Sequence, residues 1–252
     1  MGPKLQVSQF KGIVPNIFTM GNTACGFFAI LSAFEGNIVD ACWLVLLAGF
    51  LDAMDGKIAR LSGTSSQFGV ELDSLSDFLS FGIAPAVIVY VAKLQYLGKW
   101  GWLISIVFIM AASFRLARYN ILADTGAKKD FLGLPTPMSA AVLVSFIIFS
   151  FYLWGQLEYS EHLVVLLILT SALMISQIEY DAVPDNLNTR RNQIKFAVII
   201  VAAILLVVNV RLLLFPIMAI YIIIGLVREL YRIFYLGVGF VKKRQIKDQE
   251  ME

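Results

Sequence analysis

Histidine, cysteine and charged side chains are scarce in this chain of 252 residues. It contains one histidine and two cysteines, and Asp, Glu, Lys and Arg together make up only 15% of it. Zinc sites are built mainly from Cys and His, so this composition argues against one. Cys25 and Cys42 sit in apolar segments, which favours a packing role over a disulfide. The net charge of +2 predicts no nucleic-acid partner.

Hydrophobic residues, by contrast, make up 59% of the chain. This share exceeds that of soluble domains and predicts an all-α fold, a polytopic bundle of membrane-spanning helices embedded in the lipid bilayer. We predict about eight spans, at residues 14–35, 38–61, 69–93, 98–122, 136–155, 161–180, 193–209 and 211–235.

The chain shows no internal repeat and no separate soluble domain, so we predict a single integral membrane domain over residues 1–252. Within it we expect a catalytic core at about 13–180, an extra C-terminal helical hairpin at about 193–235 and a polar tail at 242–252. The hairpin is expected because one long apolar stretch must turn at Asn209 to fit a bilayer.

Loop lysines and arginines predict the orientation. With an even number of spans both termini lie on one side, and the opposite side holds only Lys93, Lys99 and Arg211. Positive charge is enriched on the cytoplasmic side of membrane proteins. We therefore expect a multi-pass protein of the cytoplasmic (inner) membrane, with both termini and the polar turn near residue 65 in the cytoplasm.

Four aspartates fall within 26 residues in the stretch 52–77. Carboxylates in membrane segments are costly and are found mostly where they pair, bind ions or take part in chemistry. The positions that define the pattern of this stretch are Asp52, Asp55, Gly56, Ala59, Arg60, Gly69, Asp73 and Asp77.

Helical spacing places these positions on two faces, since residues three and four apart share a face. The first five lie on one helix, the last three on the next, and residues 61–68 contain Gly63 and four Ser or Thr that can turn the chain back. The two faces can then meet. Oxygen ligands at this density suit a divalent cation such as Mg²⁺, Mn²⁺ or Ca²⁺. The alternative is a structural hairpin with buried ion pairs, but only Lys57 and Arg60 are near enough to neutralise four acids.

The stretch matches the pattern D-x2-D-G-x2-A-R-x8-G-x3-D-x3-D at every fixed position. It resembles the signature of the CDP-alcohol phosphatidyltransferases. The segments PNIFTMGNTACGF and RLARYNILADTGAKKDFLGLPTP are similar to the phosphatidylserine synthase branch of that family, so the resemblance covers about residues 13–140.

The resemblance implies an enzyme that transfers a phosphatidyl group from CDP-diacylglycerol to an alcohol, here L-serine, with release of CMP. It implies metal ligation by Asp52, Asp55, Asp73 and Asp77, with Asp77 also the general base and placed at the edge of the metal shell. It also implies a homodimer. The residues expected to bind CDP-diacylglycerol are Asn16, Thr19, Asp52, Gly56, Ala59, Arg60, Ser66 and Gly69. Simpler roles remain open for Asn16 and Thr19, as packing at the start of a helix, and for Ser66, as a turn serine.

Arg115 and Arg118 are three residues apart at the cytoplasmic end of the fourth predicted span. One hypothesis is that they bind the carboxylate of serine, with Asn120 adding a hydrogen bond. The other is that they extend toward lipid headgroups without touching substrate.

Two other functions stay open at this stage. The first is the same chemistry with another acceptor, glycerol 3-phosphate or an inositol phosphate, because the aspartate motif defines the donor and not the acceptor. The second is a divalent-cation transporter that uses intramembrane aspartates as ligands. The absence of repeats and the arginine beside the acids argue against the transporter.

Overall fold

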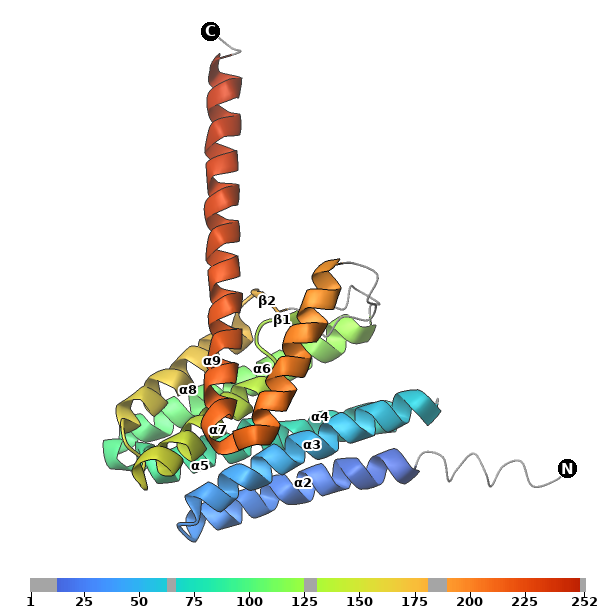
Figure 1. The fold of residues 1–252 in the computed structure, drawn as a ribbon, viewed down its shortest axis with the longest axis vertical. Helices are drawn as coiled ribbons and strands as arrows, with labels where there is room; N and C mark the ends of the chain where they lie inside the picture. Colours follow the sequence, from blue (N-terminus) through green and yellow to red (C-terminus); the bar gives the residue numbers. More distant parts are fainter. Residues whose placement is uncertain (1–12, 63–66, 125–130, 181–189, 250–252) are drawn as a thin grey trace, which may run out of the picture.

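The computed structural model describes residues 13–62, 67–124, 131–180 and 190–249, and they are almost entirely helical (Figure 1). The elements in chain order are α2 (Ile13–Phe34), α3 (Ile38–Ser62), α4 (Gln67–Asp77), the π-helix η1 (Phe78–Ile83), α5 (Ala84–Ala92), the 3₁₀-helix η2 (Leu94–Leu97), α6 (Lys99–Asp124), β1 (Phe131–Leu132), α7 (Thr136–Trp154), α8 (Ser160–Ile175), β2 (Glu179–Tyr180) and α9 (Arg190–Gln249). The predicted all-α fold is confirmed, with one small addition. The strands β1 and β2 form a two-residue antiparallel ladder after α6 and α8.

Five helical segments among the described residues are long and apolar enough to cross a membrane. They are Asn16–Phe34, Phe68–Ala92, Lys99–Leu122, Thr136–Trp154 and Phe196–Arg232. The helix α8 is shorter but also apolar, and α3 differs from the five segments in the acids that it contains, among them the first two aspartates of the motif. The chain is therefore a multi-pass membrane protein, while the number of eight spans stays a prediction.

The third predicted span is one helical path made of α4, η1 and α5, and its middle turn is a π-helix. Pro85, in the first turn of α5, has no N–H to donate to the carbonyl four residues earlier, at Phe81. We attribute the widened turn to this missing bond, since π-turns form where the i→i−4 ladder is interrupted. Asp77 is the residue directly before the π-helix, and the π-turn buries Ser80, Phe81 and Gly82.

The helix α2 packs along α3, as Figure 1 shows, and it also contacts α4, η1 and α5. The approach to η1 is close, because a Cβ atom on Gly26 would lie 2.8 Å from the Cα of Ser80. Only glycine allows two helices to approach this closely at that point. The close approach brings polar side chains of α2 against the end of α4, where the last two aspartates lie.

The helix α9 consists of two arms that meet at Asn209, which has extended backbone angles (φ −157°, ψ 89°). The side-chain oxygen of Asn209 accepts a hydrogen bond from the Leu212 N–H (3.2 Å) and so begins the second arm. Its amide group donates to the Tyr152 hydroxyl of α7 (2.9 Å). Phe215 packs against Phe146 of α7, with ring centroids 5.1 Å apart. The turn therefore lies where the sequence predicts it, and α9 stays helical through Gln249 (Figure 1).

Candidate functional site

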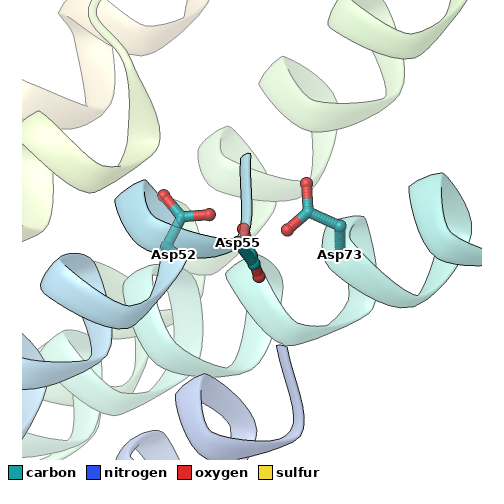
Figure 2. Close-up of side chains that lie close together, drawn as sticks. All are labelled: Asp52, Asp55 and Asp73. Atoms are coloured by element: carbon teal, nitrogen blue, oxygen red, sulfur yellow. The ribbon is translucent and has the colours of Figure 1, made fainter. Parts of the chain in front are cut away.

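Three carboxylates from two neighbouring helices converge in the structure. Asp52 and Asp55 come from α3, Asp73 comes from α4, and one oxygen of each lies within 4.8 Å of the others. Figure 2 shows Asp52 and Asp73 turned toward each other, with Asp55 between them. Asp52 and Asp55 share one face of α3 because they are three residues apart, and α4 runs back antiparallel to α3. The aspartate faces of the two helices therefore meet, as the helical spacing predicts.

Asp77 lies one turn further along α4 and belongs to the same cluster of acids. The Asp77 carboxyl interacts electrostatically with Asp52 and Asp73. One oxygen of Asp77 also accepts a hydrogen bond from the side-chain amide of Asn22 on α2 (3.3 Å). Asp77 is outside the set of three whose oxygens all lie within 4.8 Å. It therefore lies beside the three-carboxylate group and not at its centre.

Asp55 is buried, and Asp52, Asp73 and Asp77 are half-buried. Asp55 is 4% exposed, and one oxygen of Asp73 is buried with no hydrogen-bond partner among the described residues. Burying a carboxylate without a partner is expensive. Several hard oxygen donors, one of them unsatisfied, are the ligands that Mg²⁺, Mn²⁺ and Ca²⁺ prefer. Opposite ligands of such a cation lie about 4–5 Å apart, so the donor set fits a divalent cation.

Hydroxyl groups on α2 hold the aspartate helices in register. The Thr19 hydroxyl donates to Asp55 (2.9 Å), and the Ser76 hydroxyl donates to the Thr19 carbonyl (3.0 Å). The Thr23 hydroxyl donates to Ser76 (2.9 Å). These bonds join α2 to α3 through Thr19 and to α4 through Ser76, so α2 forms the third wall of the site.

The residues expected to bind the phosphatidyl donor differ in how they lie relative to the aspartate cluster. Thr19 is buried against Asp55, and Asn16 is partly exposed one turn earlier on α2. A Cβ atom on Gly56 would meet no atom of the described residues within 4 Å, so these residues leave open space beside the cluster at that point. Gly69 lies on the first turn of α4.

Three further expectations lie partly or wholly outside what the structure describes. Ala59 and Arg60 are in the last turns of α3, but their side chains are outside the described part of the chain. Ser66 falls in the segment 63–66, which is outside the described residues altogether.

The two arginines of α6 have different surroundings. Arg115 is 6% exposed, donates to the Thr136 hydroxyl at the start of α7 (3.3 Å) and stacks over the Tyr119 ring (5.4 Å). Asp77 is the acid that acts on it electrostatically. Arg115 therefore lies close enough to Asp77 to interact with it electrostatically from a neighbouring helix.

Arg118 instead binds the C-terminal end of α8. Its guanidinium donates to the carbonyls of Ile175 (3.0 Å), Met174 (3.1 Å) and Ser176 (3.2 Å). Three carbonyls at a helix end are a natural binding place for a cation. Asn120 donates to the Ser74 hydroxyl of α4 (2.9 Å) and so joins α6 to the aspartate helix.

Several residues of the site were not singled out from the sequence, among them Asn22 and Thr136. Asn22 bonds to Asp77, and Thr136 bonds to Arg115. Asn22 follows Thr19 by three positions and thus shares its helical face, so extending that face would have found it. Thr136 lies in GLPTP, but no local pattern indicates that a threonine there would meet an arginine 21 residues earlier.

Comparison with known proteins agrees with these observations. The family model described as CDP-alcohol phosphatidyltransferase matches residues 12–179. The chain is 33% identical over 222 residues to a CDP-diacylglycerol–serine O-phosphatidyltransferase of Helicobacter pylori, covering 87% of this chain and 92% of that protein. A protein of the same name from Methanocaldococcus jannaschii is 35% identical, covering 85% and 94%. An archaetidylserine synthase of Methanothermobacter thermautotrophicus is 37% identical, covering 68% and 70%.

The carboxylate cluster predicts that the purified protein binds Mn²⁺ and that Asp73→Asn weakens this binding by about tenfold or more. Even outer-shell partners of a metal contribute about 10–100-fold in affinity, and Asp73 is placed to be a direct ligand. Titration with Mn²⁺ followed by electron paramagnetic resonance measures the free ion. Asp40→Asn is the matched control, because Asp40 is an exposed acid in the first turn of α3. Equal Mn²⁺ affinity in wild type and Asp73→Asn would contradict the assignment.

Proposed function

The chain belongs to the CDP-alcohol phosphatidyltransferase family, and we propose that it transfers the phosphatidyl group of CDP-diacylglycerol to L-serine, giving phosphatidylserine and CMP. One observation supports this most strongly. The family's carboxylates converge from α3 and α4 beside open space at Gly56, in a chain similar to serine phosphatidyltransferases over most of its length.

We propose that the donor lies along α2, α3 and the start of α4. Its pyrophosphate would approach the backbone at Gly56, where no side chain stands in the way. Arg60 would pair with phosphate oxygens, as arginine does in many phosphate sites. The remaining donor contacts that we propose are Asn16, Thr19, Asp52, Ala59, Ser66 and Gly69.

Asp52, Asp55 and Asp73 would hold a divalent cation, Mg²⁺, Mn²⁺ or Ca²⁺, with Asp77 at the edge of the group. The unsatisfied oxygen of Asp73 and the all-oxygen donor set support this assignment. When bound, such a cation supplies neutralisation of the pyrophosphate and of the charge that develops on departing CMP.

Asp77 would act as the general base. Its carboxylate takes the proton of the serine hydroxyl while the hydroxyl oxygen forms a bond to the phosphorus that bears the diacylglycerol. The bond from that phosphorus to CMP breaks, and CMP leaves with the electron pair. Transfer of this kind depends on positioning more than on covalent help from the protein. The place of Asp77 beside the three-carboxylate group suits this role, because a carboxylate bound directly to a metal is a weak base.

Arg115 would bind the carboxylate of serine. It is buried, lies across from Asp77, and has a planar group that can hold two oxygens. Arg118 and Asn120, the other two residues expected at the serine site, are engaged with the end of α8 and with Ser74. We therefore place the serine contact at Arg115 and a supporting role at Arg118 and Asn120.

We also propose that the aspartate cluster faces the cytoplasm, that the enzyme resides in the inner membrane, and that it forms a homodimer. The distribution of loop cations supports the orientation. Lys93, one of the few cations expected on the far side, follows α5 and pairs with Glu161 (2.8 Å), whereas the aspartates lie toward the other end of the same helical path.

The function is tested with purified enzyme in detergent, CDP-diacylglycerol and a panel of acceptors. CMP release should depend on serine, and the lipid product should have the mass of phosphatidylserine. Glycerol 3-phosphate and an inositol phosphate serve as competing acceptors. Turnover with one of these and not with serine would overturn the acceptor assignment, and no CMP release with any acceptor would overturn the reaction.

Asp77→Asn should lower kcat on the order of 10²–10⁴-fold, the usual contribution of a positioned general base. The Kd for CDP-diacylglycerol should change little, because the donor is held by other residues. Initial rates and donor binding are measured on the same preparation. Glu71→Gln, which changes an exposed acid on the same helix, is the control and should behave like wild type. Near-wild-type turnover of Asp77→Asn would mean that another group accepts the proton.

Arg115→Lys should raise the KM for serine by about tenfold or more, from the loss of roughly 1.5–3 kcal/mol of charge-assisted hydrogen bonding. The KM for CDP-diacylglycerol should change much less. Arg118→Lys is the comparison variant, and it should lower the melting temperature because lysine cannot reach three carbonyls at once. If Arg115→Lys raised the donor KM and left the serine KM alone, Arg115 would be a phosphate ligand.

A further inference from the structure

Asn22 is a buried amide at the centre of the contact between α2 and the aspartate helix. Its side chain is fully buried, and its amide nitrogen donates to one oxygen of Asp77 (3.3 Å). The side-chain oxygen of Asn22 has no hydrogen-bond partner among the described residues. The bond to Asp77 is therefore the one hydrogen bond that the structure shows for this side chain.

Packing alone does not account for an amide at this position. A buried polar group with an unsatisfied oxygen destabilises the fold, and an apolar side chain of similar shape would avoid that cost. Buried polar groups that remain partly unsatisfied need a specific explanation. The contact with Asp77 offers one, since Asp77 is the only ionisable group that this amide is seen to touch in the described part of the chain.

The surroundings of Asn22 hold its amide at a defined place relative to Asp77. The backbone carbonyl of Asn22 accepts a hydrogen bond from the Ser80 hydroxyl (2.9 Å). The next residue, Thr23, donates to Ser76 (2.9 Å). Ser76 and Ser80 stand on either side of Asp77 in the chain, and Gly26 lets α2 approach this segment closely. The donor and acceptor are thus fixed by bonds that flank them on both helices.

We propose that Asn22 is a positioning residue for the general base, an inference that rests on the proposed function. An amide N–H on one oxygen of Asp77 fixes the rotation of the carboxylate and leaves the other oxygen for the serine hydroxyl. Proton transfer depends on this geometry, because the base must lie within hydrogen-bond reach of the proton that it removes. Supporting groups that lock a catalytic side chain act in the same way in other sites.

The test compares Asn22→Leu, which keeps the branched heavy-atom skeleton and removes the donor, with Thr23→Val, which removes a hydroxyl bond between the same two helices. For Asn22→Leu, kcat should fall on the order of tenfold to hundredfold, a part of the rate that a positioned base supplies. The KM values for CDP-diacylglycerol and serine should stay within about threefold of wild type, because the change affects the transition state and not substrate binding. Thr23→Val should lower kcat less than Asn22→Leu does, by no more than about threefold, because it weakens the contact between the same two helices but leaves the amide donor to Asp77 in place.

Three results would overturn the inference. The first is an unchanged kcat in Asn22→Leu. The second is a raised KM for CDP-diacylglycerol with an unchanged kcat, which would make Asn22 a substrate ligand. The third is an equal loss of kcat in Thr23→Val, which would indicate a role in helix packing. If Asn22→Leu is not monodisperse, Asn22→Ala replaces it in the same comparison. Failure of the proposed function is a separate result, because wild-type enzyme would then make no phosphatidylserine.

Discussion

Mutual repulsion of buried carboxylates is the constraint on which the rest of this structure depends. Asp52, Asp55 and Asp73 come within 4.8 Å of one another, and Asp77 adjoins them, in a chain whose helices are otherwise apolar. Such a cluster is unfavourable unless hydrogen bonds, a cation or a charged substrate compensate it. The fold supplies the hydrogen bonds through α2 and leaves open space at Gly56. The strain that remains is what a metal and a pyrophosphate would relieve.

The α2 helix is as important to the site as the two helices that contain the motif. Its hydroxyl and amide groups meet Asp55, Ser76 and Asp77 on two different helices. The π-helix after Asp77 is part of the same arrangement, because it places Ser80 where its hydroxyl reaches the Asn22 carbonyl. The π-helix directly after Asp77 therefore helps to hold Asn22 against this proposed base. π-Turns are frequent at functional sites.

The helices could be predicted from the sequence because they follow from the length of its apolar runs. The convergence of the aspartates could be predicted because it follows from their spacing on a helix. The sequence was not sufficient for contacts that depend on how helices cross. Nothing in the local pattern distinguishes Arg115 from Arg118, yet one faces Asp77 and the other binds the end of α8. The π-turn was missed for a similar reason. Pro85 signals a weakened ladder, but whether a helix kinks, ends or widens there is decided by the packing around it.

The different surroundings of the two arginines also bear on substrate choice. The guanidinium of Arg118 is engaged by three carbonyls, whereas Arg115 donates to one neutral hydroxyl among the described residues. The buried guanidinium of Arg115 has five N–H donors, and its contacts among the described residues are one hydroxyl and one aromatic ring. It is best satisfied by an anion that arrives beside Asp77, and an amino acid presents its carboxylate a short distance from its hydroxyl. The hydrogen-bond donors of Arg115 thus favour an acceptor that is anionic at one end, whereas the aspartates favour a cation.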